Sequence, residues 1–193
     1  MALDTDARAT LLRAARQSIE RTLTGNRLSF ENDNSDAVLH EKHASFVTLK
    51  RHGALRGCIG TLEATRPLLQ DVIHNARAAA FQDPRFPALT QPELAGLHIE
   101  ISVLSTAVPI TARNRAELLQ LLQPGEDGLI VQEGARRATF LPSVWETLPD
   151  AGDFFDQLMQ KAGLGAAYWS ASLQLFRYQA DNFVDELIYF RCR

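Results

Sequence analysis

Apolar residues recur at helical spacing in the first part of the chain. The stripe consists of Leu11, Leu12, Ala15, Ile19 and Leu23. This spacing predicts a helix over residues 5–24, with Asp4 or Thr5 as its N-cap and Gly25 placed to end it. Residues 25–43 mix asparagine, aspartate, serine and charged side chains with few apolar ones, so we predict a flexible loop there.

Strand-like and helix-like segments then alternate to the end of the chain. Residues 44–50 and 54–63 are rich in β-formers, and Gly53 between them can supply the positive φ of a tight antiparallel hairpin. The remaining predicted elements are a helix over 67–82, a rigid proline-rich loop over 83–94, a strand over 97–104, a helix over 114–123, a hairpin over 128–142, a short helix over 142–148, a helix over 152–164 and a strand over 173–181. On helix 67–82 we expect Asp71, His74 and Arg77 to form the polar face.

Hairpin-type neighbours outnumber strand-helix-strand repeats in this order of elements. The pattern predicts an α+β fold with a mainly antiparallel sheet flanked by helices. With 193 residues and 46% hydrophobic content, residues 1–193 can bury the core of a single domain, or of a larger lobe with a smaller lobe packed on it.

Charge and cysteine content narrow the class of protein. A net charge of −3 argues against a protein whose overall charge drives binding to phosphate backbones. The sequence has neither a signal-peptide pattern nor an apolar run long enough to span a membrane. Its two cysteines, Cys58 and Cys192, are too few for a disulfide framework, which fits a reducing compartment. We therefore expect a cytoplasmic protein without a membrane segment.

Seven short segments carry a resemblance to a known family. They are FVTLK, LRGCIGTLE, DPRFPALT, EISVL, GEDGLIV, ATFLPSVWE and KAGL, in this order from residue 46 to residue 164. Together they resemble the AMME chromosomal region (AMMECR) family, also called AmmeMemoRadiSam system protein A. The LRGCIG block at residues 55–60 is the hallmark of that family.

The resemblance implies an α+β fold with a larger and a smaller lobe, in a family whose molecular activity is not established. Bacterial and archaeal members tend to be encoded with a Memo-like protein and a radical SAM protein, so these two are the implied partners. It gives no ground for assigning the partners' iron-sulfur cluster or SAM to this chain, and we expect no cofactor. His40 and His43 lack the spacing of a HExxH site, and we expect no metal.

The LRGCIG block is the first candidate site. In a regular strand Arg56, Cys58 and Gly60 share one face. Cys58 becomes a nucleophile if a neighbouring cation stabilises its thiolate, whereas a single cysteine in a strand is more often a small buried apolar residue. Gly57 and Gly60 indicate a bulge or a close approach by backbone or ligand. We predict a binding pocket around these residues.

Two further groups extend the candidate site. Arg56 and Arg85 could hold a carboxylate or a phosphate, with Asp83 nearby; the alternative is a solvated turn and a structural Arg85–Asp83 pair. Glu100 lies on the strand face opposite Ile99, and it is our candidate general base. A solvated outer face is the commoner outcome for such a residue.

Three functions follow from these residues. The first is an accessory or binding component that acts with Memo-like and radical SAM partners, or holds a small anionic ligand, through the LRGCIG pocket. The alternative is an enzyme that uses Cys58 as nucleophile or Arg56 to orient an anionic substrate. An RNA-binding or regulatory protein is a second alternative. The aromatic residues Trp145, Trp169, Phe154 and Phe155 favour a core over a base-stacking platform, so nucleic acid is not the expected partner.

Overall fold

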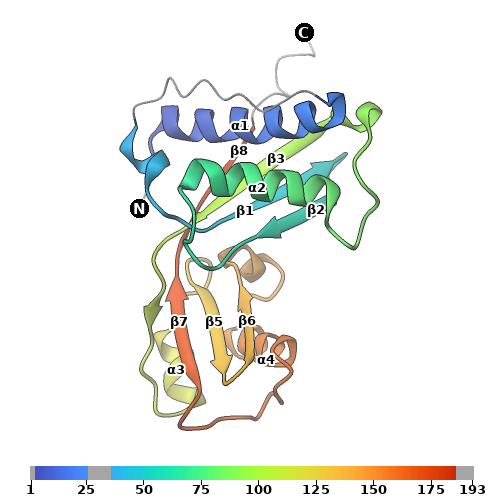
Figure 1. Cartoon of the computed structure of the whole chain (residues 1–193). Coiled ribbons are helices and arrows are strands. Elements are labelled where there is room, and N and C mark those ends of the chain that lie inside the picture. Colours follow the sequence, from blue (N-terminus) through green and yellow to red (C-terminus); the bar gives the residue numbers. More distant parts are fainter. Residues whose placement is uncertain (1–2, 26–35, 186–193) are drawn as a thin grey trace. The chain divides into compact units, whose positions relative to one another are not determined.

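The fold is an α+β arrangement of α-helices and two antiparallel sheets (Figure 1), which confirms the predicted fold class. We describe it from a computed structural model, for residues 3–25 and 36–185. The chain divides into two compact units. The first comprises the residues up to Leu104 together with those from Asp181 onward, and the second comprises Ser105–Ala180.

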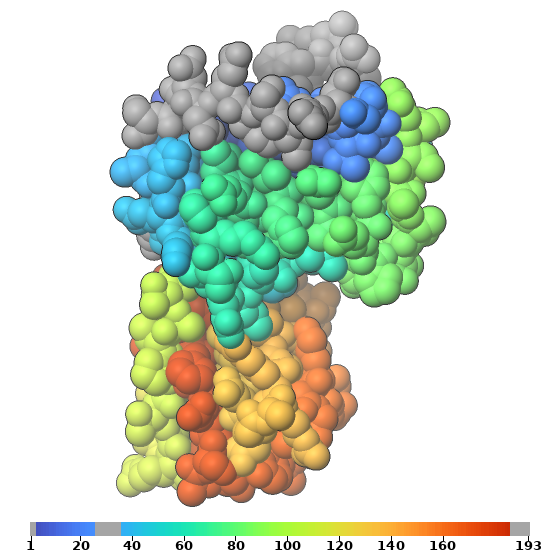
Figure 2. Space-filling model, in the orientation of Figure 1, coloured from blue at the N-terminus to red at the C-terminus, as the bar shows by residue number. Residues whose placement is uncertain are grey.

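The first unit is a four-stranded sheet covered by helices. Its elements are α1 (Thr5–Thr24), η1 (Ala37–His40), β1 (Ser45–Arg51), β2 (Ala54–Gly60), α2 (Leu68–Phe81), η2 (Gln91–Leu94), β3 (Leu97–Leu104) and β8 (Ala180–Val184). The strand order is β2-β1-β3-β8. In Figure 2 the green atoms of α2 cover the sheet on the side that faces the viewer. Buried side chains of α1 and α2 share one apolar core with those of β1 and β3.

Helix α1 has the bounds that the sequence predicts. Asp4 is the N-cap, and its carboxylate accepts a hydrogen bond from the Ala7 N–H. Gly25 closes the helix at φ 72°, in the left-handed region where glycine carries no steric penalty. Leu11 and Ile19 are fully buried, so the predicted stripe faces the core.

Helix α2 differs from the prediction at one residue. The polar face carries only His74 and Arg77 of the three residues expected there, because Asp71 is fully buried. The prediction for Asp71 was wrong because hydrogen bonds from Ser45, Thr61 and Asn75 to its carboxylate compensate its burial.

The hairpin between β1 and β2 forms as predicted, with an irregularity in the second strand. Both turn residues have positive φ, 51° at His52 and 78° at Gly53, as two-residue hairpin turns require. Leu49 pairs with Gly57, but Lys50 pairs with Leu55, so Arg56 is an extra residue. A β-bulge therefore interrupts the regular alternation of side chains at Arg56.

The second unit is built around another four-stranded sheet. Its elements are β4 (Val108–Pro109), α3 (Arg115–Leu121), β5 (Gly128–Glu133), β6 (Arg136–Phe140), η3 (Pro142–Glu146), α4 (Ala151–Lys161) and β7 (Gln174–Tyr178). The strand order is β4-β7-β5-β6. Trp145 stacks on Phe154 with ring centroids 3.8 Å apart, and Phe155 is fully buried. Trp169 packs against the same core, so these aromatic rings are core residues and offer no base-stacking platform.

The last predicted strand was wrong in one respect. Residues 173–181 do not form one strand: β7 and β8 belong to different sheets, and the chain passes between them at Gln179. Gln179 leaves the ladder because its backbone pairs with Ser105, with its N–H donating to Ser105 Oγ and its carbonyl accepting from the Ser105 N–H. The two-residue strand β4 was not predicted.

Part of the predicted loop over 25–43 lies outside the described residues, which resume at Asp36. Within the rest of that loop, Ala37–His40 form a 3₁₀ helix capped by the Asp36 carboxylate. None of the helices in the described part of the chain has the length and apolar character needed to cross a membrane.

Candidate functional site

The β-bulge places Arg56 in contact with the loop that follows α2. Only 9% of Arg56 is exposed. Its Nε lies 2.8 Å from Glu93 Oε1, and its Nη2 donates to Glu93 Oε2 and to the carbonyl of Pro87. The hydrogen bond from Arg56, with a further one from the Thr90 N–H, lowers the pKa of Glu93 to about 2. The structure thus engages Arg56 in an internal ion pair.

Asp83 and Arg85 cover the outer edge of β2, which is an edge strand. The Cys58 N–H donates to Asp83 Oδ2 at 2.8 Å, and Arg85 Nη2 donates to the Cys58 carbonyl at 3.2 Å. The two loop side chains also form a bidentate ion pair with N–O distances of 2.9 and 2.7 Å. We call this arrangement of Asp83, Arg85 and the Cys58 backbone the edge brace. It satisfies backbone groups that an edge strand otherwise leaves unpaired.

The edge brace and the Arg56 ion pair meet at one aromatic ring. The guanidinium carbons of Arg56 and Arg85 lie 5.8 and 5.6 Å from the centroid of the Phe86 ring. Such distances allow cation–π attraction to both arginines. The DPRFP segment therefore interlocks with LRGCIG through Asp83, Arg85 and Phe86.

The carboxylates of Glu93 and Asp83 make the unfolding free energy depend on pH in the acid range. The hydrogen bond from Arg85, together with the Cys58 and Arg85 backbone N–H groups, holds the pKa of Asp83 well below its usual range. Both carboxyl groups have a lower pKa in the folded protein than in the unfolded chain, where the pKa is about 4. Their stabilisation is therefore complete above the unfolded-state pKa, and it is lost as the pH falls from there through the folded-state pKa. We expect the unfolding free energy to decrease from about pH 5 downward.

The measurement is urea unfolding at a series of pH values. The double variant Asp83→Asn/Glu93→Gln should be less stable than wild type at pH 7 and should show a flatter acid limb, whereas the exposed control Glu146→Gln should follow wild type. Equal acid slopes in wild type and double variant would contradict the assignment.

The two glycines of the motif are explained by close packing inside the first unit. A Cβ on Gly57 would lie 2.1 Å from the carbonyl oxygen of Ala79 in α2. A Cβ on Gly60 would lie 2.2 Å from Cγ of the Phe46 ring, which belongs to the cross-strand partner of Gly60. The Ala79 backbone and the Phe46 ring fill the space that these glycines leave.

Cys58 and Glu100 lie in one row of the first sheet, on the face turned away from the helices. Val47 and Ile99 are fully buried in the helix-covered core, so the alternate residues of β1 and β3 point to the other side. Thr48 pairs with Cys58 on one side and with Glu100 on the other. We call this side the open face. It carries Phe46, Thr48, Lys50, Cys58, Gly60, His98, Glu100 and Ser102.

Two polar contacts order the side chains of the open face. The Thr48 hydroxyl donates to Cys58 Sγ at 3.3 Å, and Lys50 Nζ lies 2.6 Å from Glu100 Oε1. Cys58 is half-buried, so it differs from the fully buried apolar cysteine considered above. Cys192 lies outside the described residues. No group of three or more metal-ligating side chains occurs within residues 3–25 and 36–185.

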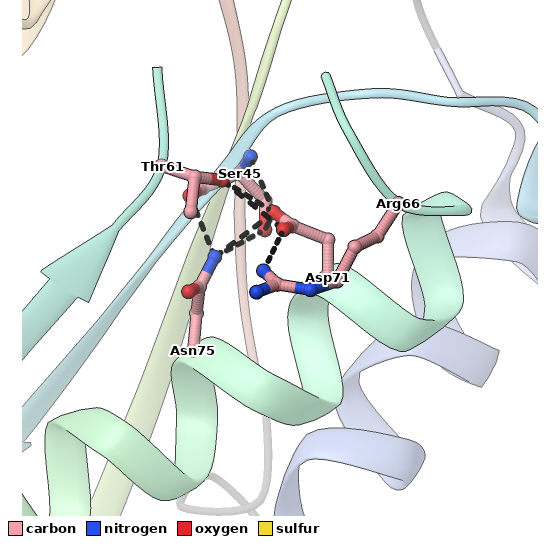
Figure 3. Close-up of polar contacts among 5 residues, drawn as sticks. All are labelled: Ser45, Thr61, Arg66, Asp71 and Asn75. Carbon is pink, nitrogen blue, oxygen red and sulfur yellow. Dashed lines mark hydrogen bonds and ion pairs between the residues drawn. The ribbon is translucent and has the colours of Figure 1, made fainter. Parts of the chain in front are cut away.

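A buried polar cluster ties α2 to both strands of the hairpin (Figure 3). Asp71 Oδ2 accepts hydrogen bonds from the Ser45 N–H and hydroxyl, from the Thr61 hydroxyl and from the Asn75 amide, at 2.8 to 3.0 Å. Arg66 lies 3.3 Å from Oδ1. Sequence reasoning missed this cluster. The available signal was that Asp71 and Asn75, four residues apart, lie next to the apolar positions Val72 and Ala76.

Comparisons with known proteins agree with one another. The model of the AMMECR1 family matches residues 12–183. A protein of Methanothermobacter thermautotrophicus is 36% identical over 186 residues, which are 95% of this chain and 97% of the relative. A protein of Methanocaldococcus jannaschii is 34% identical over 180 residues, covering 89% of this chain and 87% of the relative.

A solved structure is similar over nearly the whole chain. The crystal structure of an uncharacterised protein from Pyrococcus horikoshii superimposes with a TM-score of 0.84 at 32% identity, covering 91% of this chain and 90% of that one. The family match spans both units and includes the hairpin, the edge brace and the open face. The chain therefore belongs to the AMMECR1 family.

Proposed function

We propose that this chain is a cytoplasmic binding component that acts with a Memo-like protein and a radical SAM protein. The open face is its docking surface. The observation that carries the proposal is the row Cys58–Thr48–Glu100 with Lys50, a set of half-buried polar side chains on the sheet face opposite the one that packs against α1 and α2. Ordered groups of both charges beside a thiol and a phenyl ring favour specific recognition of a protein surface.

The contacts that hold the strands of the open face in place support a binding role. The edge brace fixes the outer strand at Cys58, and the Asp71 cluster fixes the start of β1 against α2. A docking surface that is rigid before binding loses little conformational entropy on association. The LRGCIG motif thus combines a braced strand with the row that it presents.

A small anionic ligand is less well supported than a protein partner. Arg56 and Arg85 are the arginines expected to hold an anion, and each already has a bidentate carboxylate partner, Glu93 and Asp83 respectively. An incoming carboxylate or phosphate would have to compete with these internal pairs. The negative net charge and the buried aromatic residues likewise give no support to RNA binding.

Covalent catalysis by Cys58 is the second candidate function. The Thr48 hydroxyl donates to Sγ, and Arg85 donates to the backbone carbonyl of the same residue. Glu100 lies in the same row as a proton acceptor, but its carboxylate is bound to Lys50. A nucleophile needs a base within hydrogen-bond reach, and this arrangement therefore favours binding over catalysis.

Substitution of Cys58 distinguishes the two functions. If Cys58 only contributes packing to a docking surface, Cys58→Ala should lose at most about 1–2 kcal/mol of stability and should keep pathway function in complemented cells. Cys58→Ser should behave similarly, because the Thr48 hydroxyl gives the new hydroxyl a partner. The measurements are urea unfolding, complementation and the rate of thiol alkylation against pH.

A different pattern would overturn the binding role. If Cys58→Ala and Cys58→Ser both fold normally and both abolish complementation, and the wild-type thiol is alkylated rapidly near neutral pH, Cys58 is a nucleophile. The partner proteins should then still bind the two variants.

A further inference from the structure

The second unit contains a hollow of mixed polar and apolar lining that the docking role does not use. It measures about 230 Å³ and opens between the first residues of the unit, the turn before β5 and the end of β7. Val108 and Tyr178 give the lining an apolar part, and its polar part comes from Ser105, Thr106, Gln123, Asp127, Arg177 and Gln179. Backbone pairing between Ser105 and Gln179 holds one wall together. The volume is below the usual range for drug-sized ligands, so only a small molecule fits.

Arg177 is the cation of this hollow. It lies on β7 between β4 and β5, and its cross-strand partner Leu129 is fully buried in the core of the second unit. Directly paired residues share a face of the sheet, so the half-buried Arg177 projects from the face that carries the core. Among the residues that the structure describes, none forms an ion pair or a hydrogen bond with its guanidinium. A cation at the margin of an apolar core is commonly paired.

Asp127 is the anion of the same hollow. Only 2% of the residue is exposed. Its Oδ2 accepts a hydrogen bond from the Gln123 N–H at 2.9 Å, and its backbone carbonyl accepts one from the Trp145 indole at 2.7 Å. These contacts fix the residue on both sides. Its Oδ1 has no donor in the described ranges, and its carboxylate forms no ion pair with Arg177.

We propose that the hollow binds a small amino-acid-like zwitterion. The ligand's carboxylate contacts Arg177, and its ammonium group contacts Asp127. Two opposite charges that do not pair with each other line this hollow, and a ligand that carries both complementary charges satisfies both. The hydroxyl of Thr106 and the amides of Gln123 and Gln179 are then available to the ligand's side chain. This inference does not depend on the docking role of the open face.

The test is calorimetric titration of the full-length protein with free amino acids, including glycine, L-serine and L-aspartate. Acetate and ethylamine serve as probes that carry one of the two charges. We expect saturable binding of at least one amino acid, and binding of acetate and ethylamine that is weaker by about tenfold or more. A bound amino acid should also raise the melting temperature.

Substitution of Arg177 and Asp127 tests whether these two residues contact the ligand. Arg177→Gln and Asp127→Asn should each weaken amino-acid binding by about tenfold or more, and Arg177→Lys should retain part of it. Asp127→Asn keeps an oxygen for the Gln123 N–H, and its melting curve shows whether it folds. The matched controls are Arg113→Gln, at an exposed arginine, and Glu126→Gln, at the exposed acid beside Asp127; both should bind like wild type.

Three results would overturn the proposal. The first is the absence of saturable binding of any amino acid in the panel at millimolar concentration. The second is acetate binding as tightly as the amino acids, which would make the hollow an anion site. The third is unchanged affinity in folded Arg177→Gln and Asp127→Asn variants.

Discussion

Replacing Gly57 by alanine should destabilise the first unit by about 3 kcal/mol or more, the largest effect expected of any single methyl group in the LRGCIG motif. The added Cβ would lie 2.1 Å from the Ala79 carbonyl oxygen. The oxygen belongs to the backbone of α2, and the Cβ is bonded directly to the backbone of β2, so neither atom can move away as the end of a flexible side chain would. The helix and the sheet would have to separate. Urea unfolding of the variant measures the loss.

The matched control is Gly165→Ala. Gly165 has open space where its Cβ would be, and its φ lies outside the left-handed region, so alanine there should change stability by less than about 0.5 kcal/mol. If Gly57→Ala unfolds at the same urea concentration as Gly165→Ala, the close approach of α2 to β2 is not a constraint on the motif.

Replacing Asp71 by alanine should cost about 3–5 kcal/mol, the range found when one partner of a buried charged network is removed. The Ser45 N–H, the Thr61 hydroxyl and the Asn75 amide would lose an acceptor in a region without solvent. Arg66 would lose its carboxylate partner as well. Thermal and urea unfolding both measure this loss.

Two comparisons sharpen this prediction. Asp71→Asn keeps one carbonyl oxygen for the donors and should fall between wild type and Asp71→Ala. Asp6→Ala removes an exposed acid from the first turn of α1 and should cost at most about 1 kcal/mol. If Asp71→Ala were as stable as Asp6→Ala, the buried cluster in Figure 3 would not hold α2 to the hairpin.

Local signals explain why much of the fold could be predicted from the sequence. Helix α1 has its cap, its apolar stripe and its terminal glycine within one continuous segment, and the predicted bounds agree with the observed ones. Strand β3 (Leu97–Leu104) alternates strictly up to Val103, and it was also predicted with the observed bounds. In both elements short-range preference and tertiary packing favour the same structure.

Features that depend on distant residues could not be predicted in this way. Arg56 and its partner Glu93 are 37 residues apart, and the bulge that presents Arg56 is visible only in the pairing with β1. Apolar and polar residues continue to alternate around Gln179, so the sequence pattern does not indicate that β7 ends and β8 begins there. Long-range pairing decides both outcomes.

The candidate site was predictable in composition but not in arrangement. Cys58 lies in β2 and Glu100 in β3, and only the antiparallel register of both strands with β1 brings them into one row through Thr48. Asp83 and Arg85 form the structural ion pair that was one of two alternatives for them. Both side chains also contact the Cys58 backbone, so the pair stabilises the outer edge of β2.

A charge swap on the open face tests the docking role most directly. Lys50→Glu/Glu100→Lys keeps an ion pair across β1 and β3 and should leave the melting temperature near that of wild type, while it reverses the charges offered to a partner. The control Arg113→Glu/Glu117→Arg swaps the ion pair between Arg113, which precedes α3, and Glu117 in the first turn of that helix. The measurement is the dissociation constant for a Memo-like protein. We expect the open-face swap to raise it by about tenfold or more and the control to leave it unchanged. Equal dissociation constants for both swaps and wild type, or no binding by wild type to either the Memo-like or the radical SAM protein, would contradict the docking role.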